Sequence, residues 1–160
     1  MHVSDVAYPW VVDIQADDTL MAAATKMRRF GVGALVVYDG ERMAGVLTER
    51  DVLRACVEGA DPGRTHLTQY LTTDPETISA DADVAEAAAT MIGLNSRHLP
   101  VVDRGRVVGM VSARDLLHAL AGDRPRRSAR RRRTRWDRLW HRKPRRWAGA
   151  ELADEGFTGR

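Results

Sequence analysis

The stretch Gly45-Val46-Leu47-Thr48-Glu49-Arg50-Asp51-Val52-Leu53 recurs 64 residues later as Gly109-Met110-Val111-Ser112-Ala113-Arg114-Asp115-Leu116-Leu117. Around it, residues 14–55 align with residues 78–119 without a gap, and 15 of the 42 aligned pairs are identical. An ungapped register of this length, with the same hydrophobic pattern in both copies, indicates an internal duplication. We therefore expect two copies of one folding unit.

Each copy predicts the order strand, helix, strand, strand, helix. β-branched runs joined by Asp39-Gly40 indicate a hairpin, and alanine-rich segments that follow acidic residues indicate helices. The expected strands are 11–14, 34–38, 43–47, 77–79, 99–102 and 106–111, and the expected helices are 20–29, 51–58, 84–93 and 115–121. The predicted fold class is α/β (α+β), with two βαββα repeats packed as a pseudo-twofold pair, because one copy buries too little apolar surface to be stable alone.

The charge divides the chain unevenly. Residues 1–123 contain 11 Lys or Arg against 18 Asp or Glu, whereas residues 124–147 contain 13 basic residues against one acidic residue. We therefore divide the chain into a first repeat at 1–60, a second repeat at 61–123 and a basic tail at 124–160. The sequence contains no apolar run long enough to span a bilayer and no secretion signal, which favours a cytoplasmic location. The single cysteine, Cys56, is expected to be a small buried hydrophobe.

The motif Gly-x-x-Thr/Ser-x-Arg-Asp admits two interpretations. Thr48 and Ser112 suit helix N-caps, and an acidic residue three positions later suits a capping box. The same position at a strand-to-helix junction also suits phosphate, because a helix N-terminus offers unpaired N–H groups and a positive dipole end. An arginine can add charge-assisted hydrogen bonds and an aspartate can accept ribose hydroxyls. Capping alone does not require the arginine that both copies contain.

The repeat, the hairpin that ends in Gly-Val-Leu-Thr-Glu-Arg-Asp, and the segment Arg97-His98-Leu99-Pro100-Val101-Val102-Asp103 resemble a tandem pair of cystathionine-β-synthase (CBS) domains, or Bateman module. The resemblance covers residues 1–122. It implies two βαββα units that associate through their sheets, two related clefts, and a disc-like homodimer. It also implies an adenine-containing ligand, such as AMP, ADP, ATP, NAD or S-adenosylmethionine, with no cofactor required.

The resemblance also implies roles for individual residues. Asp51 and Asp115 would bind the ribose, with Thr48 and Ser112 near ribose and phosphate. Arg50 and Arg114 would reach the phosphates. The backbone near Ile14 and Ile78 would line the adenine, together with His98 and Pro100 of the second copy. The first copy has Ala34 and Val36 at the last two places, which makes the second cleft the better candidate.

Catalysis and metal binding are not expected. His98 has no second His or Cys at ligand spacing, so we expect it to line the cleft or to pack there. The chain has no nucleophile-and-base motif and no Walker loop. The sequence therefore favours a stand-alone regulatory sensor that acts on a protein partner whose identity the sequence does not give.

The tail combines arginine with tryptophan. Arg130, Arg131, Arg132 and Arg133 form a like-charge block that is expected to be disordered by itself, and Trp136 and Trp140 fit one or two turns of a basic amphipathic helix, with Trp147 beyond. Three interpretations remain open: a solvated tail that folds back on the acidic body, attachment to an anionic membrane, and binding of nucleic acid. The alternative to a sensor is thus a dimerising scaffold without a ligand, whose tail is the active part.

Overall fold

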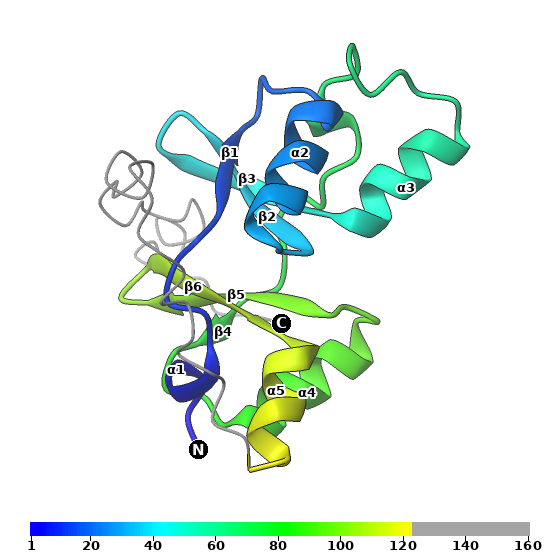
Figure 1. Cartoon of the computed structure of the whole chain (residues 1–160). Helices are drawn as coiled ribbons and strands as arrows, with labels where there is room; N and C mark the ends of the chain where they lie inside the picture. Colours follow the sequence, from blue (N-terminus) through cyan, green and yellow to red (C-terminus); the bar gives the residue numbers. More distant parts are fainter. Residues whose placement is uncertain (123–160) are drawn as a thin grey trace. The chain divides into compact units, whose positions relative to one another are not determined.

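The computed structural model describes residues 1–122, so the predictions for the tail at 124–160 lie outside the described residues. The elements are α1 (Val3–Val6), β1 (Asp13–Gln15), α2 (Leu20–Phe30), β2 (Ala34–Asp39), β3 (Arg42–Thr48), α3 (Glu49–Val57), the 3-10 helix η1 (Leu67–Gln69), β4 (Ile78–Ser79), α4 (Val84–Gly93), β5 (His98–Asp103), β6 (Arg106–Ser112) and α5 (Ala113–Leu120) (Figure 1). The mixed α/β fold and the strand and helix order predicted for each copy are confirmed. No helix among residues 1–122 is long and apolar enough to cross a membrane.

The described chain forms two compact units whose boundaries differ from the expected ones. The first unit spans residues 11–76, and the second contains residues 77–122 together with residues 1–10. Residues 1–10 therefore belong to the second unit, and the connector after residue 60 belongs to the first. The expected division at 1–60 and 61–123 follows the sequence repeat, whereas the compact units group the chain by its contacts.

Each unit contains one three-stranded sheet with the same pairing. In the first unit the strand order is β1-β2-β3, and in the second it is β4-β5-β6. The first two strands of each sheet, β1 with β2 and β4 with β5, are parallel. The two strands of each hairpin, β2 with β3 and β5 with β6, are antiparallel. Each hairpin carries one register shift, between Val37 and Tyr38 in the first unit and between Val101 and Val102 in the second. The duplication thus extends to the irregularities of the sheet.

Each unit also has its own hydrophobic core, built from one sheet face and the helices. In both units branched aliphatic residues, alanine and methionine fill the core, as the low aromatic content requires. The buried members are Ile14, Leu20, Ala23, Met27, Leu35, Val37, Leu47, Ala55 and Leu67 in the first unit, and Val3, Val6, Ile78, Ala87, Met91, Leu99, Val101, Val111 and Leu116 in the second.

Two short segments, residues 2–8 and 66–72, act as straps, and we call them the N-terminal strap and the central strap. The N-terminal strap pairs with β6 through two backbone hydrogen bonds between Tyr8 and Met110, with N···O distances of 2.9 and 3.2 Å. The central strap pairs with β3 in the same way, between Thr72 and Val46, at 2.9 and 3.0 Å. Each strap therefore satisfies backbone groups at the edge of a hairpin strand.

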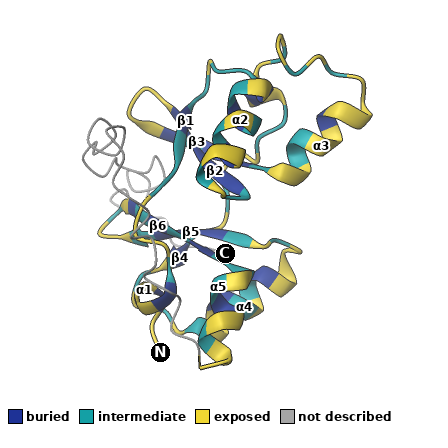
Figure 2. Cartoon of the chain, in the orientation of Figure 1, coloured by how far each residue is buried: buried dark blue, intermediate teal, exposed yellow. Residues whose placement is uncertain are grey.

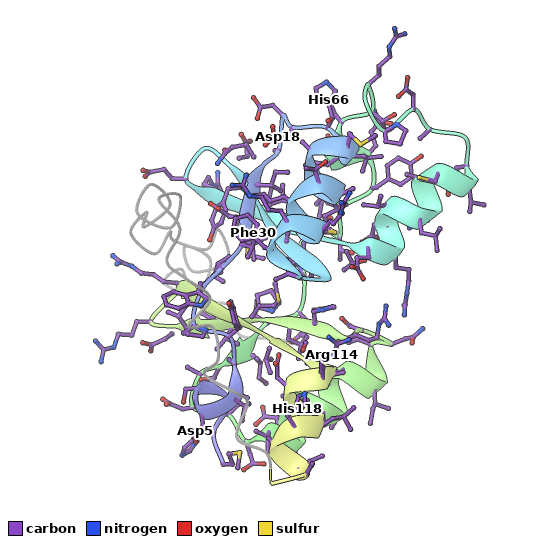
Figure 3. The ribbon with its side chains drawn as sticks, in the orientation of Figure 1. Asp5, Asp18, Phe30, His66, Arg114 and His118 are labelled. Carbon is purple, nitrogen blue, oxygen red and sulfur yellow. The ribbon has the colours of Figure 1, made fainter. Side chains whose placement is uncertain are left out.

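The straps are themselves related by the 64-residue shift. His2 and His66 occupy equivalent positions, and a ring nitrogen of each lies 2.7 or 3.1 Å from a backbone carbonyl oxygen, that of Asp81 or Asp17 (Figure 3 labels His66). Val3 and Leu67, the next residues, are completely buried. The repeated unit is thus longer than the aligned core from Ile14 onward.

The motif glycines allow the straps to approach. A Cβ atom on Gly109 would lie 2.5 Å from the Tyr8 carbonyl oxygen, and one on Gly45 would collide with the Thr72 carbonyl oxygen. Only glycine leaves room for backbone at such a distance. The glycine of the motif is therefore explained by strap packing.

The prediction for Cys56 was wrong. Its side chain is exposed, whereas the preceding Ala55 is completely buried. The helix α3 buries only Ala55, and the adjacent position is rotated by about 100° around the axis toward solvent.

We predict that Gly109→Ala lowers the free energy of unfolding by about 1–3 kcal/mol, because the new methyl group displaces the N-terminal strap. The matched control is Gly93→Ala at the end of α4, where a Cβ has no neighbour within 4 Å. Urea unfolding should show the control unchanged or stabilised by up to about 1 kcal/mol. Equal stability of Gly109→Ala and the control would contradict the packing argument.

Candidate functional site

In the second unit the motif spans the end of β6 and the first turn of α5. Ser112 is the N-cap of α5 with an extended backbone, and its hydroxyl accepts a hydrogen bond from the Asp115 N–H at 3.3 Å. In return, Asp115 Oδ2 accepts from the Ser112 N–H at 2.8 Å and from the Ser112 hydroxyl at 2.6 Å. The two residues form a capping box, and the structural interpretation of the motif is confirmed.

The first unit repeats this arrangement between β3 and α3. Thr48 is the N-cap, and Asp51 Oδ2 accepts from the Thr48 N–H at 2.9 Å and from its hydroxyl at 2.6 Å. The Asp51 N–H donates to the Thr48 hydroxyl at 3.4 Å. Both junctions are therefore fixed by the same reciprocal hydrogen bonds.

Capping uses only one oxygen of each carboxylate. Among residues 1–122, Asp115 Oδ1 has no hydrogen-bond or ion-pair partner, and the side chain is only partly buried. Asp51 Oδ1 instead lies 3.4 Å from Arg54 Nη2. A capping role and a ligand-binding role are thus compatible, because the second oxygen of Asp115 can still accept hydrogen bonds.

The β5–β6 register brings His98 to the motif. His98 is the cross-strand partner of Ser112, and Pro100 is the partner of Met110. Directly opposed residues on antiparallel strands point to the same face of the sheet, so His98 lies beside Ser112. Because side chains alternate between the two faces of a strand, His98 and Ser112 lie on the face opposite to Leu99 and Val111, which belong to the core. In the first unit Ala34 and Val36 occupy the corresponding positions, opposite Thr48 and Val46.

The structure places the other predicted residues in two settings, the strands β1 and β4 and the first turns of α3 and α5. Ile14 and Ile78 are buried in the cores of their units, so their side chains are not available to a ligand and only their backbone could line a base. Arg50 and Arg114 are exposed in the first turns of α3 and α5, one position before the carboxylates (Figure 3 labels Arg114).

One residue of this region was not identified from the sequence. Arg54 lies one turn after Asp51 on α3 and contacts both that carboxylate and Tyr70 of the central strap. The available signal was the spacing of three residues on one helix, which puts Asp51 and Arg54 on the same face. Its contact with Tyr70 depends on the strap, which no local pattern predicts.

Within the described ranges, no group of three His, Cys, Asp or Glu residues gathers in a way that could hold a metal ion. The chemistry of the motif is that of hydrogen bonding and charge: a carboxylate oxygen, a helix N-terminus, and an exposed guanidinium group. This combination can bind a polar ligand that carries both hydroxyl donors and an anionic group.

Comparison with known proteins agrees with this architecture. The family model for the CBS domain matches twice, at residues 11–58 and 67–122. An uncharacterized 17.7 kDa protein of Acidianus ambivalens is 34% identical over 120 residues, which cover 74% of this chain and 72% of the relative. Among solved structures, the CBS-domain protein ATU1752 of Agrobacterium tumefaciens has a TM-score of 0.70 at 25% identity and covers 75% of this chain and 99% of its own.

The CBS domain pair of protein MJ0100, solved with 5′-methylthioadenosine and S-adenosyl-L-methionine, has the same fold, with a TM-score of 0.70 at 23% identity. The match covers 76% of this chain and 97% of that one. Two family matches, one in each half of the duplication, account for most of the sequence. The chain belongs to the CBS domain family and contains two copies of the domain.

Proposed function

We propose that the chain is a regulatory module without catalytic activity that binds an adenine nucleotide, AMP, ADP or ATP, at the motif of the second repeat. The observation that carries the proposal is the second carboxylate oxygen of Asp115, which the capping box leaves available beside the N-terminus of α5. NAD and S-adenosylmethionine are alternative ligands of the same class. The adenosine derivatives bound by MJ0100 make this class the one to test first.

The chemistry of the site matches the parts of a ribonucleotide. Asp115 Oδ1 can accept a ribose hydroxyl, in the way a carboxylate does in dinucleotide-binding folds. The backbone N–H groups of the first turn of α5 and the Arg114 guanidinium suit the phosphate, which is anionic. His98 lies on the same sheet face as Ser112, is partly exposed and offers a flat ring to the base, whereas the Pro100 side chain is completely buried and leaves only its backbone to line the base.

Binding would regulate by a difference in affinity. A ligand shifts an equilibrium between two conformations only by as much as its affinity for the two differs. Because Ser112 and Asp115 fix the strand-to-helix junction, a ligand on that carboxylate would favour conformations in which the junction is intact. The conformational change is then passed to a protein partner or to the tail.

We predict that AMP, ADP or ATP stabilises the full chain at millimolar concentration and that Asp115→Asn weakens binding about tenfold or more. Asparagine still offers one oxygen to the Ser112 N–H and hydroxyl, so the cap is retained, but its amide nitrogen cannot accept a ribose hydroxyl. Isothermal calorimetry measures the affinity, and thermal unfolding without ligand checks the cap. Absence of binding by every nucleotide would overturn the sensor proposal, and unchanged affinity in Asp115→Asn would remove Asp115 from the site.

A second proposed property is self-association through helices α3 and α5. Each helix buries only one residue, and much of both helices is exposed, as the yellow stretches of Figure 2 show. Leu53 and Val57 on α3 are 64% and 80% exposed, and Leu117 and Leu120 on α5 are 67% and 73% exposed. Apolar side chains grouped in this way are typical of interaction surfaces, and a homodimer would cover them.

We predict that Leu117→Asp with Leu120→Asp converts a dimer into a monomer, because two carboxylates cannot be buried in an apolar interface. Sedimentation velocity measures the mass, and Arg106→Asp on the exposed β5–β6 hairpin is the control for added negative charge. A monomeric parent protein, or a doubly substituted variant that stays dimeric, would contradict the proposal.

The tail supplies a second candidate function. Residues 124–147 contain thirteen basic residues, and Trp136, Trp140 and Trp147 lie in the same segment. This combination suits either an anionic membrane surface or single-stranded nucleic acid. Here a dimer of the CBS domain pair would act as a scaffold that presents two tails, one from each chain.

We predict that truncation to residues 1–123 abolishes binding to vesicles containing anionic lipid, to single-stranded RNA, or to both. A variant with alanine at Arg130, Arg131, Arg132 and Arg133 should lose most binding, because phosphate neutralisation provides most of the affinity. Co-sedimentation with vesicles and fluorescence anisotropy with RNA identify the partner. Equal binding by the truncated and full chains would contradict both tail hypotheses.

A further inference from the structure

The two copies of the site differ at Asp51, which has an arginine partner. Arg54 Nη2 lies 3.4 Å from Asp51 Oδ1, the oxygen that capping does not use. The same nitrogen donates to the Tyr70 carbonyl oxygen at 3.0 Å. The Arg54 guanidinium carbon lies 5.5 Å from the centroid of the Tyr70 ring, within the range of a cation–π interaction.

Tyr70 holds this arginine in place. Its N–H donates to the Leu67 carbonyl oxygen at 3.0 Å, which fixes the residue to the end of η1 in the central strap. A hydrogen bond to the Glu58 side chain raises the pKa of Tyr70, with burial adding to the effect. Arg54 is therefore oriented by two groups of Tyr70, its carbonyl oxygen and its ring.

The second repeat has none of these partners. The 64-residue shift places His118 at the position of Arg54, Val6 at that of Tyr70, and Gly122 at that of Glu58. Figure 3 shows His118 on α5, one turn after Arg114. A valine offers no π face, and an imidazole lacks the length and the forked donors of a guanidinium group. The pairing at Asp51 is a property of the first repeat.

We propose that Arg54 is a specificity-determining residue that makes the first repeat the weaker of two nucleotide sites. The inference rests on the proposed function, since it concerns ribose binding by Asp51 and Asp115. A ribose hydroxyl that approaches Asp51 meets a charged donor already beside Oδ1, and charge-assisted contacts are stronger than neutral ones. The Asp51 side chain is 14% exposed, so the approach to its oxygens is narrow. At Asp115 no arginine occupies the position equivalent to Arg54.

The two sites therefore fill at different nucleotide concentrations. At low nucleotide concentration only the second repeat fills, and the first fills once the ligand displaces Arg54.

The decisive experiment is calorimetry of AMP with the full chain, parent and variants, fitted to two sites. Arg54→His installs the residue of the second repeat and should tighten the weaker site about threefold to fivefold, with the tighter site unchanged. Asp51→Asn should remove only the weaker site in the parent chain. His118→Arg, the reciprocal exchange, should not tighten either site.

Two outcomes would overturn the proposal. If Arg54→His leaves both affinities unchanged, Arg54 does not compete with the ligand. If it weakens the first site, Arg54 binds the ligand itself. Should AMP bind nowhere, the proposed function fails, and the arginine contact is then tested alone by NMR of the Arg54 guanidinium group. The contact predicts hindered rotation that Asp51→Asn relieves, and free rotation in the parent chain contradicts it.

Discussion

The reciprocal hydrogen bonds between Ser112 and Asp115 determine what the second site can do. They end β6, begin α5 and hold one carboxylate oxygen at the junction, with Ser112 N–H and hydroxyl donors at 2.8 and 2.6 Å. The aspartate that stabilises the helix is thereby fixed in one orientation before any ligand arrives. A fixed acceptor loses little conformational entropy on binding, which favours recognition of a ligand with matching hydroxyl groups.

The straps make the junctions part of a longer repeated unit. Each strap forms two backbone hydrogen bonds with a hairpin strand next to the motif glycine, so the strand that leads to the N-cap is supported on both edges. In the first unit the central strap also provides the Tyr70 carbonyl oxygen and ring that hold Arg54. The same fold thus supports two carboxylates with different surroundings.

The sequence predicted the local structure well, because periodicity, hairpin residues and N-caps act over a few positions. The strands and helices of both copies begin and end within about two residues of the expected positions. The straps were missed because their contacts join distant segments, and in the region before Ile14 only His2 and His66 reveal the repeat. Cys56 was misplaced because composition cannot tell which face of a short helix meets the core. The coexistence of a capping box with an available oxygen on Asp115 required atomic distances.

The central claim is that Asp115 Oδ1 accepts a ribose hydroxyl, and a thermodynamic cycle tests it most directly. Calorimetry would compare AMP with 2′,3′-dideoxy-AMP on the parent chain and on Asp115→Asn. The account predicts that loss of the hydroxyls weakens binding at the second repeat about tenfold or more in the parent chain and leaves binding at that repeat nearly unchanged in Asp115→Asn. An equal loss of affinity in both proteins would contradict it.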